Sequence, residues 1–94
     1  GGENVHPPEV EAVLRHYPGV MDAVAVPRPD PELGQRVVAH LVLREPDPDV
    51  QDRVRAWSAS RLAPAQRPVA VVVHDQLPRN AAGKVLRRAL TEGD

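Results

Sequence analysis

The chain has 94 residues, of which 41% are hydrophobic and 27% are charged, and its net charge of −1 disfavours a nucleic-acid-binding protein, because such proteins usually carry an excess of basic residues. This length and composition predict one small globular domain, and the absence of cysteine excludes a disulfide scaffold and a thiol nucleophile. No apolar run approaches the roughly 18 residues of a membrane span and no signal peptide is apparent, so we expect a cytoplasmic protein without a membrane partner.

A first helix is predicted between Pro7 and Tyr17. Proline suits the first turn of a helix, where its missing N–H group would have had no partner, and Pro8 follows Pro7 directly. The Pro18-Gly19 pair should end the helix. Apolar side chains recur at helical spacing between these limits, at Val10, Val13, Leu14 and Tyr17.

Two strands are predicted to follow this helix. Residues 20–26 form a short run rich in β-branched side chains, and residues 37–44 alternate in the manner of a strand. Between them, residues 27–31 contain three prolines. Because each proline lacks the N–H group that a central strand needs, we predict a stiff loop there.

The second half of the chain is predicted to form a helix, a strand and a last helix. Asp47-Pro48-Asp49 suits a helix start, with an aspartate N-cap followed by proline, and Pro64 should end this helix. The valine-rich residues 69–74 predict a strand that is buried on both faces. A loop over 75–83 and a helix over 84–91 complete the chain.

The predicted order of elements is therefore α-β-β-α-β-α. This order predicts an α+β fold in which helices cover a small, mostly antiparallel three-stranded sheet. We expect residues 1–94 to form a single domain.

The N-terminal motif is Gly1-Gly2-Glu3-Asn4-Val5-His6-Pro7-Pro8-Glu9-Val10-Glu11. Its two glycines allow the backbone to approach another surface closely and to adopt positive φ angles. Taken alone, the same residues fit a terminal loop before an amphipathic helix.

A second motif runs from Leu77 to Lys84 and includes Pro78-Arg79-Asn80 and Gly83-Lys84. Lys84 is the only lysine of the chain, and in such a loop its ammonium group can point at a phosphate or a carboxylate. The motif is not a P-loop, because Pro78 and Val85 stand where a P-loop needs glycine and a hydroxyl side chain. Taken alone, an exposed loop with a solvated lysine explains the motif equally well.

Other polar residues indicate no further site. Arg87 and Arg88 beside Lys84 form a basic cluster that is too small to indicate nucleic-acid binding. The histidines lack the spacing of metal ligands, so we predict no metal site; they are His6, His16, His40 and His74.

The two motifs and Gly34-Gln35-Arg36-Val37-Val38-Ala39 occur in an order and at separations that closely resemble one known domain. This is the C-terminal domain of adenylate-forming enzymes, the superfamily of acyl-CoA synthetases, luciferases and peptide synthetases. The resemblance covers essentially the whole chain. The N-terminal motif is most similar to that of an acyl- or aryl-CoA synthetase.

The resemblance implies an enzyme that works in two steps. A carboxylate attacks ATP to give an acyl-adenylate and pyrophosphate, and the thiol of CoA then displaces AMP to give a thioester. The C-terminal domain is mobile in this family and rotates between the steps against a large N-terminal domain, which is the expected partner. ATP with Mg²⁺ and CoA are expected in the full-length ligase, whereas this chain alone should bind none of them tightly and should be inactive.

The resemblance also implies site residues. Lys84 would be the adenylation lysine, which contacts the α-phosphate and the carboxylate of the substrate. The residues expected at the CoA and pantetheine channel are Gly1, Gly2, Glu3, Asn4 and Arg67. The chain departs from aryl-CoA ligases beside Arg67, where Ala65 and Val69 replace an aromatic residue and a lysine.

Two other hypotheses stay open. Pro78, four further residues and Gly83-Lys84 resemble the pattern on which such synthetases are acetylated. The chain would then be a recognition module for a GNAT-type lysine acetyltransferase that inactivates the enzyme at Lys84, with a deacetylase reversing the change. The remaining hypothesis is a stable fragment without activity.

Overall fold

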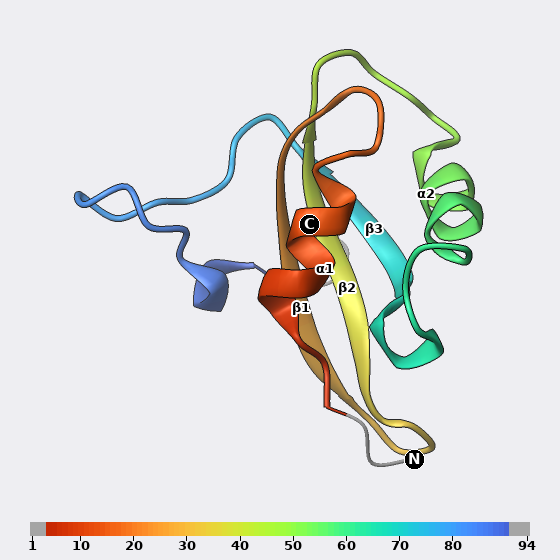
Figure 1. Ribbon diagram of the computed structural model, residues 1–94. Coiled ribbons are helices and arrows are strands. Elements are labelled where there is room, and N and C mark those ends of the chain that lie inside the picture. The colour runs from red at the N-terminus through yellow and green to blue at the C-terminus, as the bar shows by residue number, and fades with distance from the viewer. Residues whose placement is uncertain (1–3, 91–94) are drawn as a thin grey trace.

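A computed structural model describes residues 4–90 and shows a twisted three-stranded sheet with two helices beside it (Figure 1). The strands are in the order β1-β2-β3; β1 is antiparallel to β2, and β3 is parallel to β2. The predicted α+β class is therefore confirmed. The helices and strands are, in chain order, α1 (Pro7–Leu14), β1 (Val20–Asp30), β2 (Gly34–Leu43), α2 (Val50–Ser58) and β3 (Pro68–His74).

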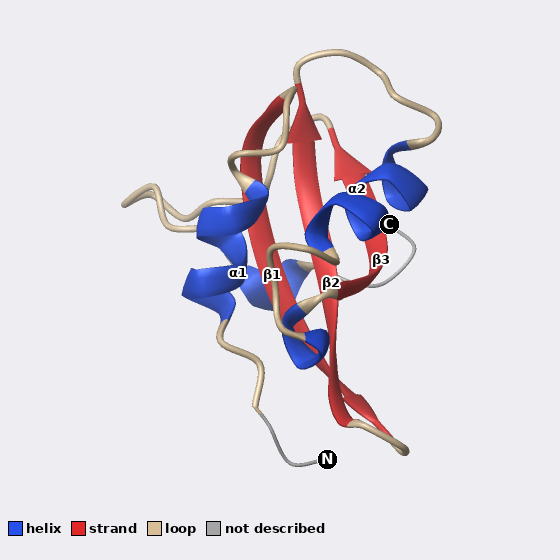
Figure 2. Cartoon of the chain, turned by 45° about the vertical axis from the view of Figure 1, so that its right-hand side comes forward, coloured by secondary structure: helices blue, strands red, loops and turns tan. Residues whose placement is uncertain are grey.

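Both helices cover one face of the sheet (Figure 2). Val10 and Leu14 of α1 and Val54 of α2 are fully buried in a core that they share with alternate residues of β1 and β2. Several of these sheet residues are alanine, whose small side chain leaves room for the helices. The sheet residues of this core are Ala23, Ala25, Val37, Ala39 and Leu41.

The other face of β1 is covered by the C-terminal segment. Val24 and Val26 point to this side and pack with Leu77 and Leu90 in a second, smaller core. The chain therefore forms three layers: helices, sheet and C-terminal segment. The loop that bears Lys84 belongs to the third layer, and in the sequence it lies between Leu77 and Leu90, which attach this layer to β1.

β1 continues through the proline-rich residues, so the predicted loop over 27–31 is wrong. Pro27 and Pro29 pair with β2 as far as Asp30. β1 is an edge strand, and the N–H of Ala25 points away from β2, to the side chain of Glu11. Prolines two and four residues further along fall in this same outward row, where no ladder hydrogen bond is lost.

The turn after β1 is held by a carboxylate. Asp30 accepts hydrogen bonds from the backbone N–H groups of Glu32 (2.9 Å) and Leu33 (2.8 Å), in the Asx-turn geometry that favours aspartate. These two bonds, first that of Leu33, lower the pKa of the Asp30 carboxyl from its ordinary value, and Arg36 lowers it further. These bonds therefore favour the ionised form of Asp30 in the turn.

β3 is not buried on both faces, as its valine-rich sequence predicted. Val69 and Val73 are 38% and 45% exposed, and only the middle of the strand is covered, with Val71 against the helical core and Val72, which points to the other face, 9% exposed. β3 is the other edge of the sheet. Continuous valine therefore marks an edge strand here rather than an interior one.

The helix predicted over 84–91 is also wrong within the described residues. This region contains only one 3₁₀ turn, Arg87–Ala89. Val85 forms a β-bridge with Arg79, and the N–H of Leu86 bonds to the carbonyl of Pro78 (2.8 Å). Packing and backbone pairing override the local helical pattern.

The first two predicted helices are confirmed but shorter than expected. α1 ends at Leu14, before Tyr17, and α2 begins at Val50 with Asp49 at its N-cap. Tyr17, in the turn after α1, makes an edge-to-face contact with Trp57 of α2, with the ring centroids 5.3 Å apart. Among the described residues, the structure contains no helix of the length and apolarity that crossing a membrane requires.

Candidate functional site

Lys84 lies at an exposed turn that the Asn80 side chain organises. The Asn80 Oδ1 atom accepts hydrogen bonds from the N–H groups of Ala82 (2.9 Å) and Lys84 (3.0 Å). The backbone N–H of Asn80 bonds to the Lys84 carbonyl (2.9 Å), and its carbonyl accepts from the N–H of Gly83 (3.0 Å). The turn is therefore closed by backbone and side-chain bonds on both sides of the lysine.

Gly83 is required by the shape of this turn. Its φ angle is +85°, which L side chains rarely adopt, whereas a Cβ atom there would meet nothing within 4 Å. Glycine is thus required here for its backbone conformation and not because a side chain would clash with neighbouring atoms. This explains the Gly-Lys order of the motif.

Arg79 connects the turn to the sheet. Its guanidinium donates to the carbonyl of Gly83 (2.7 Å) and also to the carboxylate of Asp22 in β1. Asp22 is itself held, since its Oδ1 atom accepts from the N–H of Ala23 (2.9 Å). No pattern in the sequence indicated that Asn80, Arg79 and Asp22 support Lys84, although Arg79 and Asn80 lie inside the motif.

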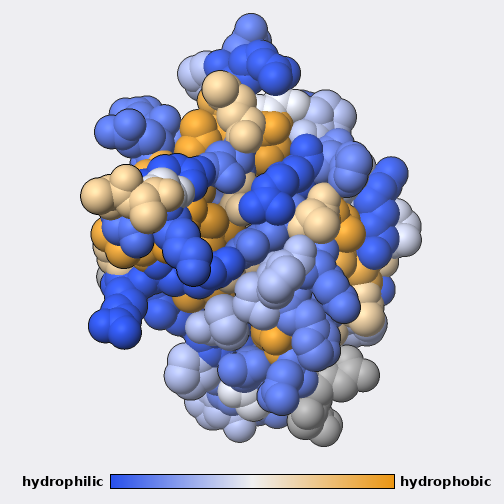
Figure 3. All heavy atoms as spheres, turned by 60° about the vertical axis from the view of Figure 1, so that its left-hand side comes forward, coloured by the Kyte–Doolittle hydropathy of each residue, from blue (hydrophilic) through white to orange (hydrophobic). Residues whose placement is uncertain are grey.

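Lys84 lines a shallow, open hollow of about 580 Å³. Its wall contains four cationic side chains, Arg15, Lys84, Arg87 and Arg88, and one carboxylate, Glu11. An excess of positive charge in a hollow concentrates and stabilises anions. Figure 3 brings this side of the domain forward and shows hydrophobic patches between hydrophilic groups.

The buried Glu11 binds residues from three parts of the chain beside the hollow. It is only 5% exposed, and its Oε2 atom accepts from the Ala25 N–H and from Arg87, both at 2.8 Å. Arg15 lies 4.0 Å from the other carboxylate oxygen. Glu11 thus joins α1, β1 and the C-terminal segment, a role that its place at the end of the N-terminal motif did not reveal.

Of the candidate CoA residues, Asn4 and Arg67 are described, and they lie elsewhere on the domain. Gly1, Gly2 and Glu3 are outside the described residues. Asn4 is exposed, and its carbonyl accepts from Gln66 Nε2 (2.9 Å), while Gln66 Oε1 accepts from the N–H of His6 (2.7 Å). Since Arg67 directly follows Gln66, the structure brings the segments of Asn4 and Arg67 together.

Asn4 and Arg67 do not share a site with Lys84. Neither Asn4 nor Arg67 lines the hollow of Lys84. Figures 1 and 2 show the segment that enters α1 at one end of the sheet and the loop near residue 80 away to its side. The Arg67 side chain donates to the Leu62 carbonyl (2.8 Å) and is half-buried.

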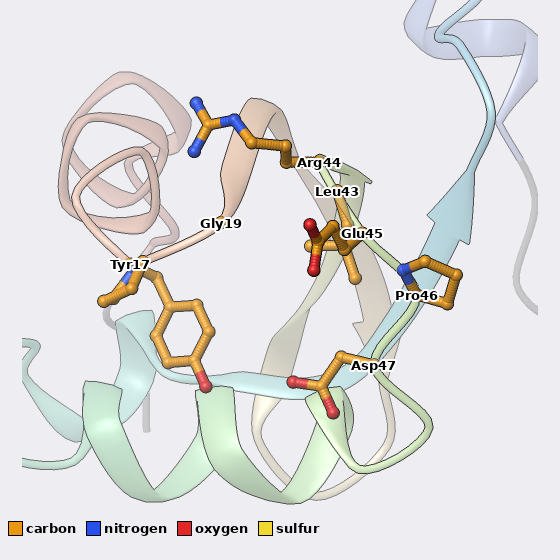
Figure 4. Close-up of a pocket in the computed structure, with 8 residues that line it drawn as sticks. Tyr17, Gly19, Leu43, Arg44, Glu45, Pro46 and Asp47 are labelled. Atoms are coloured by element: carbon orange, nitrogen blue, oxygen red, sulfur yellow. The ribbon is translucent and has the colours of Figure 1, made fainter.

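A second hollow, of about 370 Å³, lies between the turn after α1 and the loop after β2. Figure 4 shows Tyr17, Glu45 and Asp47 around it. Its rim includes Arg44 as well as both carboxylates, and no residue predicted from the sequence to be functional lines it. The hollow therefore carries charges of both signs, which do not favour one class of ligand.

Within residues 4–90, no group of three or more His, Cys, Asp or Glu side chains is placed to hold a metal ion. The buried His40 instead makes a hydrogen bond with His74, 2.8 Å between Nδ1 and Nε2. Such a pair satisfies polar atoms on the sheet.

Known proteins with the same arrangement identify the domain. Residues 9–84 match the AMP-binding enzyme C-terminal domain family. This chain belongs to that family. The AMP-binding C-terminal domain described here is 44% identical over 93 residues to 4-chlorobenzoate–CoA ligase of Pseudomonas sp. strain CBS-3, and 37% identical over 92 residues to a long-chain-fatty-acid–CoA ligase of Bacillus subtilis.

Solved structures agree. The o-succinylbenzoate CoA synthetase of Bacillus subtilis, in complex with its acyl-adenylate intermediate, matches this AMP-binding C-terminal domain with a TM-score of 0.87 at 37% identity. The match covers 100% of this chain and 19% of that one. In the Pseudomonas ligase the matched region is 98% of this chain and 18% of the ligase. The domain thus spans less than a fifth of the length of these relatives.

Proposed function

We propose that this domain works as the C-terminal part of an ATP-dependent acyl-CoA synthetase and that Lys84 promotes its adenylation step. The observation that supports this most directly is the placement of Lys84. It is the only lysine, it stands on a turn fixed by Asn80 and Arg79, and it borders a hollow with an excess of positive charge.

The chemistry of adenylation suits such a lysine. A carboxylate oxygen attacks the α-phosphorus of ATP, and the bond from that phosphorus to pyrophosphate breaks. Two anionic groups must approach each other, and negative charge increases on the phosphate oxygens in the transition state. A preorganised ammonium group at this point lowers the barrier, most strongly when the large domain excludes water.

The thioester step would use the other end of the domain. We propose that the segment of Gly1, Gly2, Glu3 and Asn4 lines the passage for the pantetheine arm and that Arg67 contacts a CoA phosphate. Gln66 supports this assignment because it holds the backbone on both sides of Val5, next to Arg67. Two separate surfaces fit a domain that turns between the two steps.

The acid that is activated is set outside this chain. Relatives of similar identity are named for 4-chlorobenzoate, sulfoacetate and long-chain fatty acids. Domains this similar serve acids this different, so the acyl pocket belongs to the large domain. ATP with Mg²⁺ and CoA are the proposed common substrates, and a cytoplasmic location is part of the same proposal.

The isolated domain should fold but show no ATP–pyrophosphate exchange. Its hollow is open, and most of the nucleotide site would be contributed by the large domain. The full-length polypeptide that contains this domain, called the parent enzyme below, should exchange pyrophosphate with the cognate acid. The same polypeptide cut off before Gly1 lacks Lys84 and the CoA segment, so it should lose both adenylation and thioester formation. Exchange by the 94-residue chain alone would contradict the proposal.

We also propose that Lys84 is a target of a lysine acetyltransferase. Its side chain is exposed on a turn whose backbone is rigidly bonded, which gives a modifying enzyme a fixed shape to recognise. Acetylation removes the positive charge of the lysine. Adenylation by the parent enzyme should then be lost, and a deacetylase should restore it.

Mass spectrometry of the isolated domain tests this second proposal. After incubation with acetyl-CoA and GNAT-type acetyltransferases from the same cell, we expect one acetyl group, on Lys84. Replacement of Gly83 with alanine, which disfavours the +85° φ angle, should reduce the yield while leaving Lys84 in place. An unmodified Lys84, under conditions that modify other synthetases, would remove the regulatory role.

A further inference from the structure

The peptide unit that precedes Lys84 is held at both of its polar atoms. The carbonyl oxygen of Gly83 accepts from Arg79 at 2.7 Å, and the N–H of Lys84 donates to Asn80 at 3.0 Å. Because a peptide unit is planar and rigid, two bonds at its opposite sides fix its orientation. The direction in which the Lys84 side chain leaves the backbone is fixed with it.

Arg79 extends this support to the sheet. Its guanidinium also bonds to the carboxylate of Asp22, which is 57 positions away in the sequence and lies just after a register irregularity in β1. One guanidinium has several N–H groups in a fixed plane and can meet two acceptors at once, which a lysine ammonium does with less geometric control. Arg79 therefore connects the Lys84 turn to a rigid strand.

The Asp22–Arg79 pair is poorly suited to a purely stabilising role. The side chains of Arg79 and Asp22 are 44% and 24% exposed. Ion pairs with this exposure contribute little to folding, because water and salt screen them. The role that fits the pair is geometric: it fixes the position of the Lys84 turn relative to the hollow that Lys84 borders.

We propose that Arg79 is a positioning residue for the adenylation step, with Asp22 as its anchor on β1. Together they hold the Gly83–Lys84 peptide so that the lysine ammonium meets the substrate in one orientation. This inference rests on the proposed role of Lys84. Arg79 would act through the lysine, by holding it in place, and not by contacting the substrate.

The test uses the parent enzyme with Arg79→Met, Asp22→Asn and the double variant. We expect each to lower kcat of adenylation by about 10-fold, since small displacements of a catalytic group carry penalties of this order or more. The KM for ATP and thioester formation from supplied acyl-adenylate should stay within about twofold. Because the two side chains act as one unit, the double variant should be no slower than the single ones.

Matched variants separate position from charge and from folding. Arg79→Lys keeps the charge and should recover only part of the lost rate. Arg53→Met removes an exposed arginine from α2 and should leave both steps unchanged. The thermal midpoint of the parent enzyme should be the same in all variants, so a loss of adenylation cannot be ascribed to unfolding.

The outcomes distinguish this inference from the proposed function. Unchanged adenylation in Arg79→Met, or an equal loss in both steps, overturns the positioning role. Independent, multiplying losses for Arg79→Met and Asp22→Asn overturn the role of Asp22 as the anchor. If Lys84→Ala itself leaves adenylation intact, it is the proposed function that fails, whatever the Arg79 variants do.

Discussion

Replacing Lys84 with alanine should slow adenylation by the parent enzyme by about 10²-fold or more, the usual loss when one preorganised electrostatic donor is removed. Lys84 is the only lysine of the domain, so no neighbouring lysine of this chain can substitute for it. Thioester formation from supplied acyl-adenylate should largely survive, because Asn4 and Arg67, the described residues assigned to CoA, do not line the hollow of Lys84. ATP–pyrophosphate exchange and thioester release, measured on the same preparation, report the two steps separately.

Two controls make the Lys84 result specific. Lys84→Arg keeps a positive charge but changes its shape and reach, and should recover only part of the rate. Arg53→Ala removes a cation from α2 that does not line the hollow, and it should change the rate of neither step. An equal loss in both steps for Lys84→Ala would refute the division of the domain into two working surfaces.

Replacing Glu11 with alanine should destabilise the isolated domain by about 2–3 kcal/mol. The change leaves the buried N–H of Ala25 without its acceptor, which costs about 1–3 kcal/mol, and removes a charge-assisted hydrogen bond from Arg87. Urea denaturation followed by the fluorescence of Trp57 measures the effect. The midpoint should fall, and the slope should not change.

The matched control lies on the same helix. Glu9 is exposed, so Glu9→Ala should change stability by no more than about 0.5 kcal/mol. Glu11→Gln keeps an acceptor for the N–H of Ala25 but loses the charge, so its stability should lie between those of the Glu11→Ala and Glu9→Ala domains. A Glu11→Ala domain as stable as the Glu9→Ala domain would show that Glu11 does not connect the three layers.

Features that depend on neighbouring residues were predicted well from the sequence. The apolar spacing after Pro7 placed α1, the alternation after Val37 placed β2, and the Gly-Lys order marked the turn at Lys84. Each of these depends on local periodicity or on one backbone angle. The sequence therefore predicted the fold class, whereas the role proposed for Lys84 came from the resemblance to a known domain and stays a prediction.

Features that depend on tertiary position were missed. The prolines of β1 are tolerated only because that strand is an edge, and the segment after Lys84 is not helical because Val85 pairs with Arg79. Glu11 reaches an arginine 76 positions away, and Arg79 reaches Asp22 across 57 positions. No local pattern specifies such partners, so the support around Lys84 became visible only in three dimensions.

Chemical rescue of Lys84→Cys is the most direct test of the central claim. The domain contains no cysteine of its own, so within it bromoethylamine would convert only the introduced thiol, which gives a close analogue of lysine. Lys84→Cys should lose adenylation while it retains the thioester step, and aminoethylation should restore adenylation; wild-type enzyme treated in the same way shows any effect on the large domain. Full aminoethylation at position 84 without recovery of ATP–pyrophosphate exchange would contradict the assignment of Lys84 as the adenylation lysine.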